Sequence, residues 1–196
     1  MRRTNTIAVL IATAAASSGC GGSEPTPSPP CEQACQDGVA LRALRETMKF
    51  AYNSTVQGKP VGPQDGVSTL FLSGSARVFG TATADPLQGT TNVDLTYVFS
   101  NVHYLFKDDE PEENYDVVID GTLTQEGTIA IQPSSTTALS MSGENVRLAG
   151  QVYDPPLDYE ACQEMSSCES GCTIAVTQSG NDVAGHFCGR KAAFSF

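Results

Sequence analysis

The stretch Asn92-Val-Asp-Leu-Thr-Tyr-Val-Phe99 carries an apolar side chain at every second position: Val93, Leu95, Tyr97 and Phe99. This period of two is typical of a β-strand that buries one face. The apolar positions then shift by one residue, to Val102, Tyr104 and Phe106. A shift of this kind predicts a β-bulge, one extra residue in the strand, near Ser100 and Asn101.

The sequence on the C-terminal side of this stretch also predicts strands. Residues 116–123 and 127–131 are rich in β-branched side chains. Residues 139–148 and 175–183 each hold Ser-Gly and two further polar residues between apolar arms, which predicts two hairpins. Glycine supplies the positive φ that tight hairpin turns need. We therefore expect an antiparallel β-meander over residues 66–196.

Four of the expected strands share the pattern apolar-x-Gly-x-apolar: Val78–Ala82, Ile119–Leu123, Leu148–Val152 and Val183–Phe187. Residues two apart lie on one face of a strand, so each glycine is expected on the core side with its apolar neighbours. A missing side chain there has two physical uses. It lets the strand bend at a barrel corner, or it lets a helix approach the sheet closely.

Residues 31–57 predict one helix. Its apolar side chains recur at three- and four-residue steps and form one stripe: Leu41, Leu44, Met48, Ala51 and Tyr52. Arg42, Arg45 and Lys49 fall on another face and are expected in solvent. The predicted fold is mainly β with one N-terminal helix (α+β), an antiparallel meander that forms a barrel or a sandwich. Residues 177–185 also resemble a hairpin of small lipocalin-like barrels from exported bacterial proteins.

The N-terminus predicts export. Arg2 and Arg3 precede the apolar run Ile7-Ala-Val-Leu-Ile-Ala-Thr-Ala-Ala-Ala16, a pattern typical of a secretory signal peptide. Ser17-Ser18-Gly19-Cys20 resembles the lipobox of bacterial lipoproteins, with Ser17 where these carry a branched aliphatic residue. The resemblance implies cleavage before Cys20 and its lipidation; the alternative is ordinary cleavage near Ala16. Seven cysteines leave an odd thiol, whereas lipidation of Cys20 leaves six, which favours the lipoprotein.

We therefore expect three parts: a signal peptide over 1–19, a lipidated Cys20 with a proline-rich tether over 20–30, and one globular domain over 31–196. The acyl chains would hold the protein on a membrane of the bacterial cell envelope, most plausibly the outer membrane on its periplasmic or surface face. An exported chain favours disulfides over metal ligation for the remaining cysteines: Cys31, Cys35, Cys162, Cys168, Cys172 and Cys188.

The alternation of the last hairpin, with a two-residue Gly180-Asn181 loop, points Cys172 inward and Cys188 outward, so the two are not expected to bond to each other. We therefore expect Cys172 to bond to the helix, through Cys31 or Cys35. Cys188 is then expected to bond to the cysteines of the 162–168 loop. Fifteen connectivities are open for six cysteines, and the sequence alone does not select one of them.

Composition restricts the function classes. The chain has 22 acidic and 11 basic residues, and its net charge of -11 argues against nucleic-acid binding. It holds no common catalytic motif, and His103 and His186 lie in no recognisable constellation. The acidic segment 108–113 fits a calcium loop or, more simply, a solvated connection between strands. We expect no cofactor and no metal.

The function predicted is therefore a non-enzymatic binding or structural module of the envelope, with a protein or small-molecule ligand that the sequence does not identify. One alternative is a lipocalin-like carrier whose barrel encloses a small apolar ligand. Another is a hydrolase that uses carboxylates such as Asp94, Asp116 or Asp120, which would have to converge in one cleft.

The Cys20→Ser variant tests the anchor. Without a thiol to acylate, we expect the protein to move from the membrane fraction to the soluble fraction when both are probed with an antibody. A wild-type protein that is already soluble, with its N-terminus at Ser17, would contradict the lipoprotein interpretation.

Overall fold

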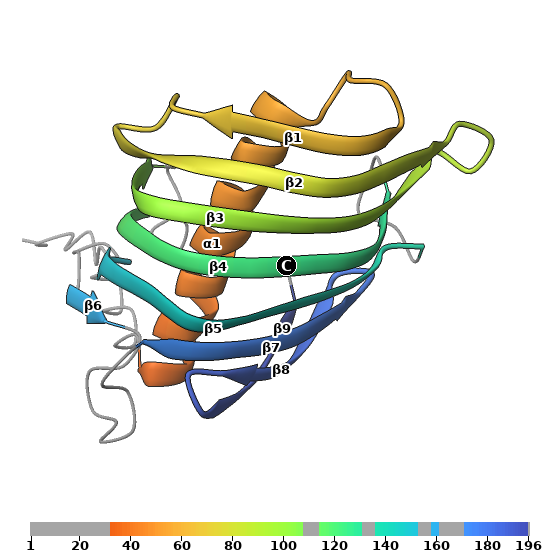
Figure 1. Ribbon diagram of the computed structural model, residues 1–196. Coiled ribbons are helices and arrows are strands. Elements are labelled where there is room, and N and C mark those ends of the chain that lie inside the picture. Colours follow the sequence, from red (N-terminus) through yellow and green to blue (C-terminus); the bar gives the residue numbers. More distant parts are fainter. Residues whose placement is uncertain (1–31, 108–113, 131–135, 153–157, 161–170, 196) are drawn as a thin grey trace, which may run out of the picture. The chain divides into compact units, whose positions relative to one another are not determined.

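Figure 1 shows the computed structural model of the protein, which describes residues 32–107, 114–130, 136–152, 158–160 and 171–195. These residues belong to one compact unit, residues 31–196. Several predictions lie outside the described residues: the signal peptide 1–19, Cys20 and the tether 20–30, Cys31, Cys162, Cys168, and the acidic segment 108–113.

The predicted helix is α1, Gln33–Thr55. It runs unbroken through Gly38, and the chain leaves helical geometry after Val56, whose N–H still bonds to the Tyr52 carbonyl. Leu41, Leu44, Met48 and Ala51 are buried, so the predicted apolar stripe is the face that packs on the sheet. Tyr52 is partly buried against the same core.

Within the described residues the sheet has nine strands, all antiparallel to their neighbours. They are β1 (Gly62–Ser68), β2 (Ser73–Asp85), β3 (Thr90–Phe106), β4 (Tyr115–Ala130), β5 (Ala138–Gln151), β6 (Asp158–Glu160), β7 (Cys172–Ser179), β8 (Asp182–Phe187) and β9 (Arg190–Ser195). The order is β1-β2-β3-β4-β5-β7-β8-β9, and β6 pairs with β5 beside this path. The mainly β fold, with one helix and an antiparallel meander, is confirmed.

Two details of the meander agree with the sequence. The register of β3 shifts between Phe99 and Val102, where the bulge was expected, and Asn101 has a positive φ of 48°. The backbone N–H of Asn101 donates to Asp120 Oδ2 at 3.0 Å, which fixes the bulge to β4. The hairpin of β7 and β8 turns at Gly180 and Asn181, as predicted.

Three other details differ from the sequence prediction. Residues 116–123 and 127–131 were expected as separate strands, but β4 runs continuously from Tyr115 to Ala130. Residues 139–148 were expected as a hairpin, but they lie within the single strand β5. The residues expected to turn, 142–145, form an irregularity in which Asn145 takes a φ of 59° and the chain continues in the same direction. The sheet also begins at Gly62, ahead of the predicted residue 66.

The repeated glycines bend the sheet. Gly80, Gly150 and Gly185 have φ values of 134°, 144° and 148°. A Cβ at each would lie 2.1 to 2.2 Å from a backbone oxygen of the adjacent strand, at Asp94, Asp116 and Ala175 respectively. The atoms it would meet belong to the sheet and not to the helix, so bending is the use that these three glycines serve.

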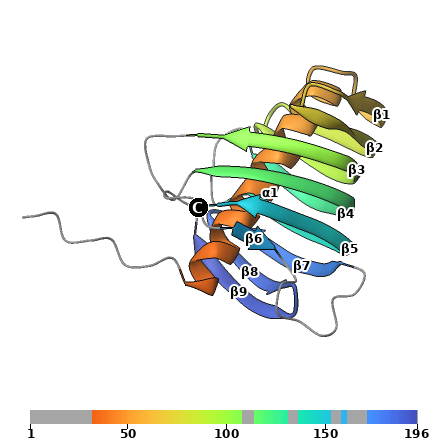
Figure 2. The same cartoon turned by 90° about the vertical axis from the view of Figure 1, so that its left-hand side faces the viewer.

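The bent sheet wraps around α1, which lies across its concave face (Figures 1 and 2). The core fills the space between the two. Its largest fully buried side chains come from both layers: Tyr97, Phe99, Ile119, Leu123, Leu148 and Ile174 from the sheet, and Leu41 and Leu44 from the helix. The sheet stays open, because its edge strands β1 and β9 are not hydrogen-bonded neighbours within the described residues.

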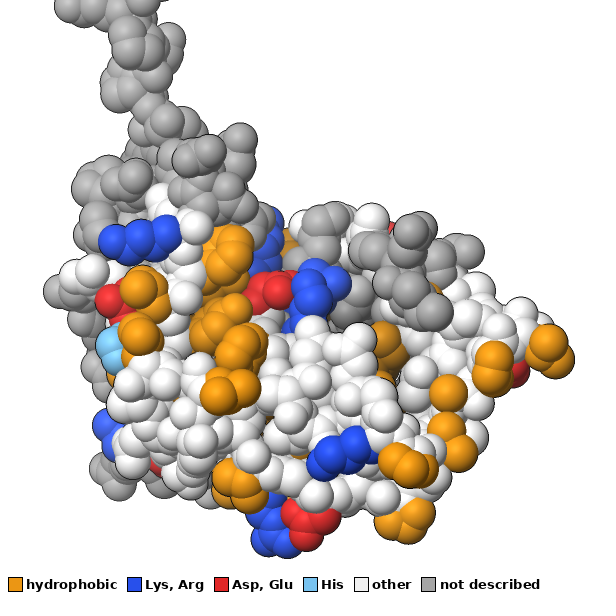
Figure 3. Space-filling model, turned by 90° about the horizontal axis from the view of Figure 1, so that it is seen from above, with side chains coloured by type: hydrophobic (Ala, Val, Ile, Leu, Met, Phe, Trp, Pro, Cys, Tyr) orange, Lys and Arg blue, Asp and Glu red, His pale blue; other side chains and the backbone are white. Residues whose placement is uncertain are grey.

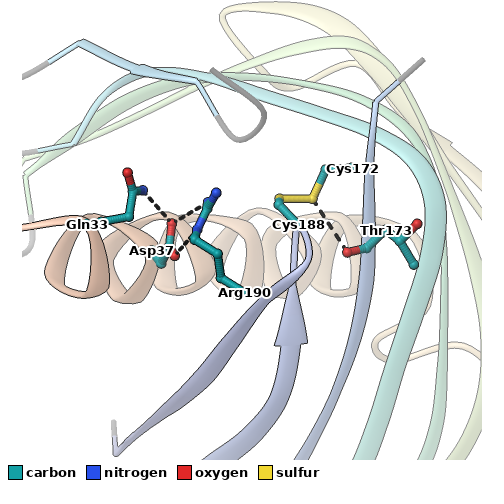
Figure 4. Close-up of a disulfide and its surroundings, with 6 residues drawn as sticks. All are labelled: Gln33, Asp37, Cys172, Thr173, Cys188 and Arg190. Atoms are coloured by element: carbon teal, nitrogen blue, oxygen red, sulfur yellow. Dashed lines mark hydrogen bonds and ion pairs between the residues drawn. A yellow bond between two sulfur atoms is a disulfide. The ribbon is translucent and has the colours of Figure 1, made fainter. Parts of the chain in front are cut away.

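The disulfide prediction for the last hairpin is wrong, because Cys172 bonds to Cys188 (Figure 4). Strand β8 ends at Phe187, and Cys188 and Gly189 form a two-residue turn with φ values of 52° and 75°. The alternation of a strand no longer applies to Cys188, so its buried side chain reaches Cys172 on the core side. Cys35 is disulfide-bonded too, to a partner outside the described residues.

An ion pair joins the start of α1 to β9. The Arg190 guanidinium donates to both carboxylate oxygens of Asp37, from Nε at 2.7 Å and from Nη2 at 2.8 Å (Figure 4). The Gln33 amide donates to the same carboxylate at 2.9 Å. Only 9% of the Asp37 side chain is exposed, so this forked pair satisfies a nearly buried charge.

Gly150→Ala and Gly38→Ala form a matched pair that tests the role of the bends. Gly150→Ala should destabilise the fold by about 3 kcal/mol, because the methyl group collides with the Asp116 backbone and the positive φ disfavours a side chain. Gly38 lies in the helix, with nothing within 4 Å of an added Cβ. Gly38→Ala should raise stability by about 0.5–1 kcal/mol.

Urea unfolding followed by circular dichroism measures both variants. Equal stabilities for the two would show that the glycine in β5 is not required for the bend.

Candidate functional site

A cleft of about 530 Å³ lies between α1 and the concave face of the sheet. One wall comes from the second half of α1 and its connection to β1, residues 45–61 in part. The other wall comes from inward-facing residues of β1 to β5, with Gln178 of β7. Sites for small ligands are typically clefts of about 300–1,000 Å³, so the cleft has the size of a binding site.

Small side chains on β2 account for the open space. The inward-facing positions of this strand are Ala76, Val78, Gly80, Ala82 and Ala84. The last two line the cleft. Because these side chains are small, the space between β2 and the second half of α1 stays unfilled.

Two tyrosines bring polar groups into the cleft. Tyr97 of β3 is buried, and its hydroxyl donates to Gln125 Oε1 of β4 at 2.8 Å. Burial raises the pKa of the Tyr97 phenol far above its usual value, so the group stays neutral. Burial also raises the pKa of Tyr52 on α1, although its hydrogen bond to the Thr91 side chain opposes the shift. Both hydroxyls therefore remain protonated and uncharged at neutral pH, and Tyr97 uses its proton in the hydrogen bond to Gln125.

A narrower apolar cavity of about 50 Å³ continues the cleft along α1. Its apolar lining is Leu41, Met48, Leu139, Met141, Val176, Val183 and Phe194. Arg45, Gln125, Leu139 and Gln178 line both spaces. The site therefore has a wide part with polar groups and a narrow part lined mainly by hydrocarbon, which meet beside Arg45.

The carboxylates named by the sequence do not converge. Asp94, Asp116 and Asp120 occupy the convex face, opposite the side that packs on α1. Asp116 bonds to the His103 ring, Asp120 accepts the Asn101 amide, and Asp94 pairs in register with Glu126. Asp116 and Asp120 are held by separate partners, Asp94 faces the like charge of Glu126 on the neighbouring strand, and none of the three lines the cleft.

His186 is exposed on β8, on the convex side, as the sequence predicted. Among the described residues, no group of three or more His, Cys, Asp or Glu side chains is placed to hold a metal ion. The calcium prediction for residues 108–113 lies outside the described part of the chain.

Sequence reasoning missed the cleft. It placed Arg45 and Lys49 on a solvated helix face; Lys49 is exposed and Arg45 is partly exposed, but the sequence did not indicate that both border a cleft. One signal was present: β2 carries only small residues at its inward positions, opposite a strand with large ones. That contrast indicates a gap only when the position of the helix is also known.

The surface around β1 is unusually apolar. Val61, Val67, Leu70 and Leu72 are each more than 60% exposed. Between the last two, Phe71 turns inward and packs against Phe50, with ring centroids 5.1 Å apart. Figure 3 shows exposed apolar side chains on this side of the molecule with basic side chains between them.

None of the helices in the described residues combines the length and the apolar character that crossing a membrane requires. Comparisons with protein-family models, with curated proteins and with solved structures found no match.

Proposed function

We propose that this protein is a lipid-anchored module of the bacterial cell envelope that binds a small molecule without transforming it. The observation that carries the proposal is the cleft of about 530 Å³ on the concave face of the sheet. The cleft is a concave surface between α1 and the sheet, and its size falls in the range typical of small-ligand sites. The cleft therefore favours a binding role.

The proposal differs from a lipocalin-like carrier in one respect. A closed barrel encloses its ligand among strands alone. Here α1 occupies much of the concave face, and the ligand would lie between helix and sheet. Lining residues from both layers, such as Tyr52 and Tyr97, would orient it.

Export and anchoring rest on the N-terminal sequence. The signal-like run and the lipobox-like Ser17-Ser18-Gly19-Cys20 support lipidation of Cys20. The Cys172–Cys188 disulfide adds support, because disulfides persist mainly in proteins that leave the reducing cytosol.

A binding role without catalysis is supported by the position of the carboxylates. Hydrolysis by paired acids needs two carboxyl groups on either side of one substrate bond. Asp94, Asp116 and Asp120 lie on the face opposite the cleft. The described residues that line the cleft include no carboxylate; their polar groups are hydroxyls, amides and the basic side chains of Arg45, Lys49 and Lys59, which position a ligand.

A fluorescent probe tests the proposed site. N-phenyl-1-naphthylamine is neutral and apolar and becomes bright when it leaves water, so it should bind the wild-type protein in the cleft. Ala84→Trp places a large side chain at a cleft-lining position and should weaken probe binding by about tenfold or more.

Ala184→Trp is the control, because Ala184 is exposed on the convex side of β8. It should bind the probe like the wild type. No binding by the wild type, or equal loss in both variants, would contradict a ligand site in the cleft.

A further inference from the structure

Two glutamines stand where the wide and the narrow parts of the cleft meet. Gln125 of β4 and Gln178 of β7 line both spaces, and both are partly buried. Each side chain uses one end of its amide group in a hydrogen bond within the protein. The end that is already bonded fixes what the other end offers to a ligand.

Gln125 offers hydrogen-bond donors. The Tyr97 hydroxyl of β3 gives its proton to Gln125 Oε1 at 2.8 Å, so the carbonyl end of this amide is turned towards β3. The nitrogen lies on the other side of the planar amide group and is therefore turned away from Tyr97. Among the described residues, none accepts a hydrogen bond from Gln125 Nε2. This nitrogen carries two N–H donors.

Gln178 offers an acceptor. Its Nε2 donates to the Gly180 carbonyl, in the turn between β7 and β8, at 2.7 Å. A carbonyl oxygen can only accept, so a flipped Gln178 amide would place two oxygens against each other. The orientation of the amide is therefore fixed, with Oε1 turned away from the turn. In the described part of the chain no group donates to this oxygen.

Strand β5 separates the donor from the acceptor. Gln125 pairs in register with Met141 of β5, and Gln178 pairs with Leu139 of the same strand. The apolar side chains of Leu139 and Met141 also line the narrow cavity. A ligand group that meets both glutamines must therefore cross an apolar surface and carry its acceptor and its donor on separate atoms. A trans amide does so, because its carbonyl and its N–H point in opposite directions.

The charges around the cleft favour an uncharged ligand. Lys49 in the wide part pairs with Glu46 at 3.1 Å, and Asp65 attracts Lys59. Both cations thus have an acidic neighbour outside the cleft lining. An anion at the junction would meet the carbonyl oxygen of Gln178, and a cationic ligand would approach the two lysines.

The narrow cavity limits the size of one substituent. Its volume is about 50 Å³. An apolar cavity of about 150 Å³ holds one benzene molecule, so a third of that volume admits about two or three carbon atoms. A short alkyl group fits, and a ring does not. The wide part, about 530 Å³, has room for a larger substituent.

We infer that the cleft binds an uncharged secondary amide with one short alkyl substituent. The ligand carbonyl accepts a hydrogen bond from Gln125 Nε2, and the ligand N–H donates to Gln178 Oε1. The alkyl group enters the narrow cavity beside Met48 and Met141, and the larger substituent lies in the wide part. This inference rests on the proposed function, because it names the ligand class of the same site.

Calorimetric titration of the protein with N-propylbenzamide and with propyl benzoate tests the inference. The two compounds have the same shape, and the ester has an oxygen where the amide has its N–H. The amide should bind about tenfold or more tightly, because the ester leaves the Gln178 carbonyl oxygen unpaired and facing another oxygen.

Three variants separate the two hydrogen bonds. Gln178→Met removes the acceptor, so amide and ester should bind within about twofold of each other. Gln125→Glu keeps an acceptor for the Tyr97 hydroxyl but loses the N–H donors, and should weaken binding of both compounds by about tenfold or more. Gln151→Met is the control, because Gln151 is an exposed residue of β5 outside the cleft, and should bind like the wild type.

Circular dichroism checks that each variant is folded. Equal binding of amide and ester by the wild type, a preference that survives Gln178→Met, or unchanged binding by Gln125→Glu would overturn the amide ligand and leave the proposed function standing. The same holds if neither compound binds while N-phenyl-1-naphthylamine does. A wild-type protein that binds none of the three compounds would overturn both proposals.

Discussion

Close contact between strand backbones at three glycines is the constraint on which the rest of the structure depends. At Gly80, Gly150 and Gly185 the neighbouring carbonyl oxygen occupies the space that a Cβ would need. Every other residue type would push the strands apart or force the backbone out of its positive φ. With glycine there, the sheet bends enough to wrap around one helix. A single long helix can then cover a concave face that would otherwise be too wide to bury.

The two ends of α1 have different environments. The first half is fixed by the Asp37–Arg190 pair, and its residues Val39–Leu41, Ala43 and Leu44 are buried. The Cys172–Cys188 disulfide nearby links β7 to the turn that precedes Arg190 (Figure 4). The second half of the helix faces the small side chains of β2, and the unfilled space between them is the cleft. Tight packing at one end gives the cleft at the other a rigid frame, which suits a binding site.

The sequence predicted those features that depend on neighbours along the chain. The bulge at Asn101 and the turn at Gly180 follow from local side-chain patterns, and both are present. The same kind of local signal was ambiguous at Ser142-Gly143-Glu144-Asn145, because a glycine with polar neighbours serves a bulge as well as a turn. The pairing of β5 with β4 and β7 decides between them, and that pairing is not local.

The Cys188 disulfide and the cleft were also not predictable from local sequence patterns. One residue of left-handed backbone reversed the direction expected for the Cys188 side chain, and with it the disulfide. The cleft depends on the distance between a helix and a strand that are far apart in sequence. The three cations that line it come from residues that sequence reasoning either assigned to solvent or did not consider, so neither their grouping nor their exclusion of acids was predictable.

The most direct test of this account is a map of the residues whose backbone amides respond to a ligand. Two-dimensional NMR spectra of isotopically labelled protein, recorded with and without N-phenyl-1-naphthylamine, provide it. The account predicts the largest shifts at residues that line the cleft, among them Tyr52, Tyr97 and Gln125, and none at His186 or Lys191 on the outside of the sheet. Shifts concentrated on the convex face, or at the exposed apolar residues Leu70 and Leu72, would contradict it.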